Sequence, residues 1–132
     1  MTALDTNVIL RFLLGDDPAQ SQAVRALFKR AEAARERFHV PVPVLLETLW
    51  VLESVQDMPR ADIIRAIDDL RRMTVLEFES DPAVERALAD AKHSHADLAD
   101  ILIGAVARSS GCTHVLTFDR RASRLPSFRL LT

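Results

Sequence analysis

The chain has 132 residues, of which 48% are hydrophobic and 27% are charged. This length fits a single domain with a real core, and this composition is too apolar for a disordered protein. The formal net charge is −2, so the field of the whole chain does not attract nucleic acid, and such contact would need a local basic patch or metal ions that neutralise acids.

Helices and short strands alternate along the chain. Asp17-Pro18 and Asp81-Pro82 each place a capping acid before a proline, which is a strong signal for the start of a helix. Apolar residues repeat at helical spacing after these starts, whereas residues 74–78 alternate as a strand does. In chain order, we predict a strand ending at 3–5, helices over 7–14 and 18–35, a strand over 38–40, helices over 44–54 and 59–70, a strand over 74–78, helices over 81–92 and 97–110, and strands over 114–117 and 128–131. This order predicts α/β layering in one domain that covers residues 1–132.

Four of the nineteen acidic residues have apolar neighbours, and they are Asp5, Glu47, Asp100 and Asp119. Asp5 and Asp119 each lie at the carboxyl end of a predicted strand, which is where open α/β sheets bind ligands. Glu47 lies in a helix that is apolar almost all round, so we expect it to face protein. The face of Asp100 also carries Gly104 and other small residues, which leave space around the carboxylate.

Gathering buried carboxylates costs several kcal/mol for each burial and adds mutual repulsion. Either raised pKa values or a bound divalent cation relieves this cost, and an all-oxygen ligand set favours Mg²⁺ or Mn²⁺ over zinc. The chemistry that such an ion supports is phosphodiester hydrolysis.

Each acid also has a structural interpretation. Asp119 is near three arginines in the sequence and can pair with Arg120, Arg121 or Arg124. Asp97 is predicted to be a helix N-cap, with Asp100 at the third helical position as in a capping box. Asp97 is therefore a secondary candidate for the site.

The same residues resemble a known family. The segments Leu4-Asp5-Thr6-Asn7-Val8-Ile9-Leu10, Ala96-Asp97-Leu98-Ala99-Asp100-Ile101-Leu102-Ile103-Gly104-Ala105 and Val115-Leu116-Thr117-Phe118-Asp119, together with the mid-chain Glu47, resemble the PIN domain. The resemblance covers essentially the whole chain. Small bacterial PIN proteins of this length are typically VapC-type toxins of toxin–antitoxin pairs.

The resemblance implies a three-layer α/β/α domain with a short, mainly parallel central sheet flanked by helices. It also implies Mg²⁺-dependent endoribonuclease activity, a homodimer, and a cognate antitoxin that blocks the site. By position in the family motifs, Asp5 and Asp100 are the principal metal ligands, and Glu47 and Asp119 complete the acidic pocket. Asn7 and Thr117 then orient carboxylates or water.

Several other interpretations remain open at this stage. Arg120, Arg121 and Arg124, with Lys92, are candidates for a basic rim that contacts RNA phosphates. A zinc site drawn from His93, His95, Cys112 and His114 matches no familiar finger spacing. The functional alternatives are another Mg²⁺-dependent phosphoryl-transfer hydrolase and a non-catalytic PIN-fold binding module.

Neither a disulfide nor a membrane location is expected. Cys112 is the only cysteine, which excludes an internal disulfide, and its neighbours predict that it is buried. No apolar run is long enough to span a membrane, and the N-terminus has no signal-peptide pattern. We therefore expect a cytoplasmic protein.

Overall fold

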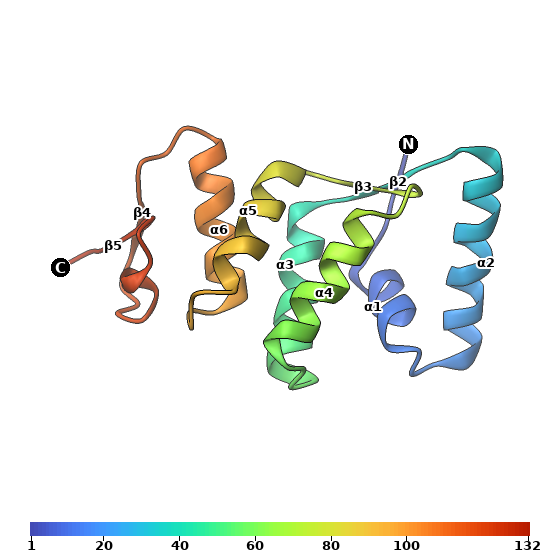
Figure 1. The fold of residues 1–132 in the computed structure, drawn as a ribbon, viewed down its shortest axis with the longest axis horizontal. Helices are drawn as coiled ribbons and strands as arrows, with labels where there is room; N and C mark the ends of the chain where they lie inside the picture. The colour runs from blue at the N-terminus through green and yellow to red at the C-terminus, as the bar shows by residue number, and fades with distance from the viewer.

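The strands of the protein form two separate parallel sheets, in a computed structural model that describes all of residues 1–132 (Figure 1). The first sheet has the order β1-β2-β3, and its strands are β1 (Thr2–Ala3), β2 (Phe38–Val40) and β3 (Leu76–Phe78). The second sheet consists of β4 (Val115–Thr117) and β5 (Phe128–Leu130). The predicted α/β class, with short parallel strands flanked by helices, is confirmed, but the strands are divided between two sheets.

Helices occupy most of the chain between the strands. They are α1 (Thr6–Leu14), α2 (Pro18–Ala34), α3 (Val42–Trp50) with a π-helical extension η1 (Val51–Val55), α4 (Arg60–Arg71), α5 (Asp81–Ala91), α6 (Leu98–Ser109) and a short 3₁₀ turn η2 (Ala122–Arg124). Asp17 caps α2 as predicted, because its carboxylate accepts a hydrogen bond from the Gln20 backbone at 3.1 Å. None of these helices is both long enough and apolar enough to cross a membrane.

Three predicted boundaries shift for local reasons. The helix α3 starts at Val42, whose backbone N–H donates to the Glu79 carboxylate at 2.6 Å, an acid 37 residues further along the chain. Strand β3 begins only at Leu76, because the Leu76 N–H turns back to the Met73 carbonyl at 3.2 Å. Ser80, with φ of 55°, occupies the cap position of α5 in place of Asp81.

Asp81 contacts another helix instead of capping its own. The Arg71 guanidinium donates to both Asp81 carboxylate oxygens at 2.9 Å and to Glu85 at 3.0 Å. Since Arg71 belongs to α4 and both acids belong to α5, these contacts hold the two helices together. The acids, with Asp81 first, also raise the pKa of Arg71 above its ordinary value.

The core lies between the first sheet and the helices and contains 28 buried hydrophobic residues. Strands β2 and β3 alternate as half-buried strands do, with Phe38, Val40 and Phe78 buried and His39 and Glu77 only partly so. The parallel register pairs Phe38 with Leu76 and Val40 with Phe78, which places the apolar side chains on one face.

The elements are spread along one axis of the molecule. Figure 1 shows α2 at one end and the β4–β5 sheet at the other, with α3 and α4, then α5 and α6, between them. Strand β1 pairs only with β2, and β4 pairs only with β5, so each of these strands has one open edge. The carboxyl ends of β1 and β4, where the sequence places Asp5 and Asp119, are therefore apart.

Candidate active site

Asp5 and Glu47 are linked through one buried residue. Asp5 follows β1 and caps α1, because its carboxylate accepts a hydrogen bond from the Thr6 backbone at 2.8 Å. The Thr6 side chain is buried, and its hydroxyl donates to the Glu47 carboxylate on α3. We call Asp5 and Glu47 the N-terminal acidic pair. Asn7, predicted to support this site, is exposed in the first turn of α1.

The prediction that Glu47 faces protein is wrong. On α3, Leu45, Thr48 and Leu49 are buried against the core, whereas Glu47 is exposed. The helix was judged apolar all round because Trp50 and neighbouring residues are apolar, but Trp50 is 56% exposed. Apolar residues on both faces of a helix hide from the sequence which face meets solvent.

Asp97, Asp100 and Asp119 form a second acidic group around the start of α6. Asp100 is half-buried in the first turn of this helix. Burial raises the pKa of Asp100, and the nearby carboxylates of Asp97, Asp119 and Glu53 raise it further, while Arg121 lowers it. We call Asp97, Asp100 and Asp119 the C-terminal acidic group.

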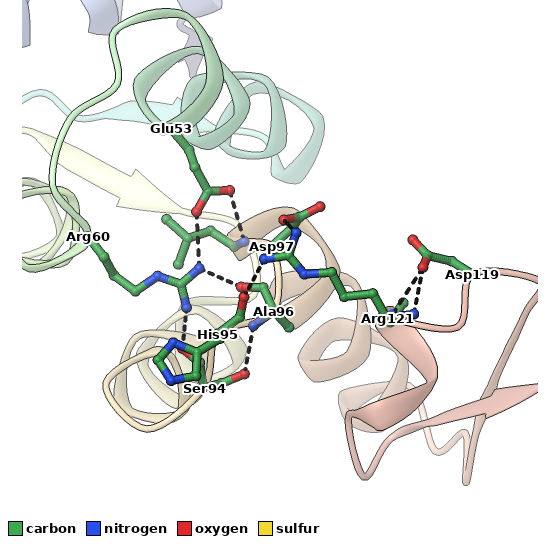
Figure 2. A network of polar contacts seen from close by, with 10 residues as sticks. Glu53, Arg60, Ser94, His95, Ala96, Asp97, Asp119 and Arg121 are labelled. Atoms are coloured by element: carbon green, nitrogen blue, oxygen red, sulfur yellow. Dashed lines mark hydrogen bonds and ion pairs between the residues drawn. The ribbon is translucent and has the colours of Figure 1, made fainter.

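Asp119 organises the turn that follows β4. Its carboxylate accepts hydrogen bonds from the backbone N–H groups of Arg121 at 2.8 Å and Ala122 at 3.3 Å, at the start of η2 (Figure 2). The backbone N–H of Asp119 itself donates to the Thr117 hydroxyl at 3.0 Å. Thr117 therefore positions the backbone of Asp119, whereas the sequence predicted that it would orient a carboxylate or water.

The predicted capping box at α6 is absent. Asp97 occupies the cap position, but its side chain makes no capping hydrogen bond. Its carboxylate instead lies 3.7 Å from the Arg121 guanidinium, which also donates to the His95 carbonyl at 2.8 Å. The Leu98 N–H at the start of α6 is satisfied by Glu53 at 3.3 Å, so an acid from η1 performs the capping role (Figure 2).

Arg60 fixes the loop that leads into α6. Its guanidinium donates to the carbonyls of Ala91, Ser94 and Ala96, the first two at 3.4 and 2.6 Å, and lies 3.0 Å from the Glu53 carboxylate (Figure 2). These contacts tie α6 to α4 and η1. The sequence analysis did not single out Glu53 or Arg60. The available signal was an acid inside the apolar run of residues 51–55, the same pattern that drew attention to Glu47.

The two sets of carboxylates remain separate in this structure. Their oxygen atoms are the donors that Mg²⁺ prefers, so the chemistry of the set suits this ion. However, no three acidic, histidine or cysteine side chains come close enough to hold a metal ion, which applies equally to the zinc site considered above. Asp5, Glu47 and Asp119 are also exposed, so the prediction of four buried acids is wrong. The arrangement shown does not by itself form a metal centre.

The predicted basic rim is divided in a similar way. Lys92 and Arg121 line one cavity of about 1160 Å³ between α4 and α5, together with His95 and four arginines, Arg60, Arg65, Arg71 and Arg72. Two acids, Asp68 and Glu85, offset part of this positive charge. Arg124 lines a different cavity of about 420 Å³ beside α6, and Arg120 is exposed.

Cys112 is exposed and unpaired, so its predicted burial is wrong. It lies in the turn after α6, beside Gly111, whose φ of 87° reverses the chain direction before β4. The turn places Cys112 at the surface, although its sequence neighbours include small and apolar residues.

Comparison with known proteins identifies the family. The PIN domain family matches residues 2–127, which include both acidic sets. The chain is also 26% identical over 125 residues to the VapC ribonuclease of Aquifex aeolicus (strain VF5), and the match covers 95% of this chain and 92% of that relative. The resemblance seen in the sequence is thus confirmed, and the chain belongs to the PIN domain family.

Proposed function

We propose that this PIN domain is an Mg²⁺-dependent endoribonuclease that hydrolyses RNA phosphodiester bonds. The observation that carries the proposal is the family match over residues 2–127, a span that holds Asp5, Glu47, Asp100 and Asp119. The likeness to a VapC ribonuclease over 95% of the chain supports the same activity. A divalent cation held by carboxylates lowers the pKa of bound water and offsets charge on phosphate oxygens.

The proposal assigns Asp5 and Asp100 as the principal Mg²⁺ ligands, with Mn²⁺ as a substitute. Glu47 and Asp119 complete the acidic pocket, and Asn7 and Asp97 support it. Since Asp5 and Asp100 belong to different acidic sets, the assignment requires the N-terminal pair and the C-terminal group to meet.

Arginine and lysine side chains supply the proposed contacts to RNA. Lys92 and Arg121 line the cavity between α4 and α5, and the arginines there add positive charge in a chain whose net charge is −2. Phosphate contacts of this kind position RNA without reading its sequence. Arg120 and Arg124 extend the surface toward Asp119.

We also propose that the protein is the toxin of a toxin–antitoxin pair, located in the cytoplasm. The support is its likeness to a VapC ribonuclease and the length of the chain. Its partners are then the RNA substrate, a cognate antitoxin that blocks the acidic residues, and a second copy in a homodimer.

Cleavage of RNA by the purified, partner-free protein tests the activity. Total RNA is incubated with wild-type protein, Asp100→Asn and Asp69→Asn, each with and without Mg²⁺. Asp69→Asn is the matched control, because Asp69 is an exposed acid on α4. We expect discrete fragments from the wild type and the control only when Mg²⁺ is present, and none from Asp100→Asn. Fragments that form equally well without metal, or with Asp100→Asn, would refute the proposal.

A further inference from the structure

The two sheets present open edges that match each other. The first sheet ends at β1 and the second at β4, and every strand pairing in the molecule is parallel. Open edges expose unpaired backbone N–H and C=O groups, and a sheet of two strands is marginal by itself. Leu116 on β4 is 61% exposed, and Phe118 just beyond it is 79% exposed. The edge of β4 is therefore both unpaired and apolar.

The acidic residues follow the two edge strands at the same distance. Asp5 lies two residues after the last residue of β1, Ala3, and Asp119 lies two residues after the last residue of β4, Thr117. Parallel pairing of Ala3 with Thr117 would place Asp5 beside Asp119, because adjacent strands are about 4.8 Å apart. An antiparallel pairing would put the two acids at opposite ends. The offset thus fits one specific pairing of these edges.

The contacts within one chain hold these two edges apart. Arg60 and Glu53 fix the start of α6 to α4 and η1, and α6 packs against α3 and α5. The second sheet is fixed to α6 in turn, because a Cβ at Gly104 would lie only 3.1 Å from Phe128 Cε1. Figure 1 shows α3 and α4 between the N-terminal strand and the end that carries β4 and β5. Pairing of β4 with β1 of its own chain would break these contacts.

A second copy of the chain satisfies both edges without breaking them. We propose that two copies pair reciprocally, with β4 of each copy added to the open edge of β1 in the other. Such an exchange is isologous and closed, so no edge remains for further copies. It converts the two short sheets of each copy into shared five-stranded sheets with the order β3-β2-β1-β4-β5.

The exchange makes the acidic site from both copies. The N-terminal pair, Asp5 and Glu47, comes from one copy, and the C-terminal group, with Asp100 and Asp119, comes from the other. As far as it concerns catalysis, this inference rests on the proposed ribonuclease function. The pairing of the strands does not depend on that function and is tested separately below.

Mixing two inactive variants tests the composite site. Asp5→Asn and Asp100→Asn are each inactive alone, since every site lacks one ligand. After unfolding and refolding together, a mixed pair holds one site with both substitutions and one site with neither. About half of randomly formed pairs are mixed, so we expect the mixture to regain about a quarter of the wild-type cleavage rate. A mixture that stays inactive beside an active wild type would overturn the exchange and leave the ribonuclease function intact.

A disulfide trap tests the strand pairing without any activity. The proposed register places Thr2 beside Leu116, within the Cα separation of 4.4–6.8 Å that a disulfide spans. Chains with Thr2→Cys and chains with Leu116→Cys, tagged differently and both carrying Cys112→Ser, are refolded together and oxidised. We expect a covalent pair that contains one chain of each kind. Arg129→Cys replaces Leu116→Cys in the control, which should stay uncrosslinked because Arg129 lies one strand further from the edge.

The single chain that carries both Thr2→Cys and Leu116→Cys gives the opposing result its own readout. An internal disulfide in an isolated monomer, with no covalent pair in the mixture, would overturn the exchange. Absence of any crosslink in either sample would also overturn it. If the wild type fails to cleave RNA, the ribonuclease proposal fails, and these disulfides alone decide the strand exchange.

Discussion

The carboxylate of Glu53 accepts a hydrogen bond from the Leu98 backbone N–H at 3.3 Å, so the start of α6 is capped by a residue 45 positions earlier in the chain. The same carboxylate lies 3.0 Å from the Arg60 guanidinium, which in turn contacts the loop before α6. The position of Asp100 therefore depends on residues outside the acidic group itself.

Replacing Arg60 with Met should lower the free energy of unfolding by about 1–3 kcal/mol, because several carbonyls lose their hydrogen-bond donor in a partly buried place. Urea denaturation of the variant gives this difference. Arg65→Met is the matched control, since Arg65 is largely exposed and pairs only with Asp62 on the same helix. Its loss should stay within about 0.5 kcal/mol, as is usual for exposed pairs. Equal losses for both variants would contradict this role for Arg60.

Asp5 has a structural role that can be separated from catalysis. Asn also caps helices well, so Asp5→Asn should fold with nearly wild-type stability, whereas Asp5→Ala should lose about 0.5–2 kcal/mol. Both variants should lose RNA cleavage, because neither supplies a carboxylate. Thermal unfolding and the cleavage assay on the same samples separate the two effects. Cleavage retained by Asp5→Asn would remove Asp5 from the proposed ligands.

The stability of Asp100→Asn should depend on pH. Because the pKa of Asp100 is raised in the folded protein, the stability that Asp100 contributes is greatest below the ordinary aspartate pKa. That contribution is lost as the pH rises through the raised value. In metal-free buffer at pH 7, Asp100→Asn should therefore unfold at a higher temperature than the wild type.

The size of this gain is limited by solvent. The side chain of Asp100 is only half-buried, so screening should keep the gain below about 1 kcal/mol. It should disappear below about pH 3.9, where aspartate is protonated in both states. Calorimetric unfolding at several pH values checks this expectation. A constant difference between the proteins across the series would contradict it.

Gly104 is the point where α6 contacts the second sheet. A Cβ there would meet Ser127 Oγ and lie 3.1 Å from Phe128 Cε1, so Gly104→Ala should loosen β5 from the helix. We expect a net loss of about 1–2 kcal/mol, in spite of the better helix propensity of alanine. Adding Ser127→Ala should recover part of this loss by removing the Oγ atom. Urea denaturation of the single and double variants measures both steps, and a Gly104→Ala variant that is more stable than the wild type would contradict the close contact.

Local signals explain how much of the fold the sequence predicts. Asp17 before Pro18 sets the start of α2, and Gly15, with φ of 62°, ends α1 where expected. The alternation around Phe38 and Phe78 identifies the strands. The sequence does not reveal the division into two sheets, because strand partners are chosen by tertiary packing and β1 and β4 carry no signal for their own partners.

The candidate site is predicted in its residues but not in its arrangement. The positions of Asp5 and Asp119 after strands are confirmed, because strand ends are marked locally. Their exposure was not predicted, since the apolar neighbours of an acid do not fix which way its side chain points. The capping acids Glu53 and Glu79 were missed because each acts on a helix start that is distant in the sequence.

Calorimetric titration with Mg²⁺ tests most directly whether the two acidic sets share one cation. Wild-type protein, Asp5→Asn, Asp100→Asn and the Asp69→Asn control are each titrated after metal removal. Since even groups outside the ligand shell change metal affinity by about 10–100-fold, loss of either ligand should weaken binding at least tenfold, while the control binds as the wild type does. If Asp5→Asn or Asp100→Asn binds Mg²⁺ as tightly as the wild type, the two acidic sets do not form one site.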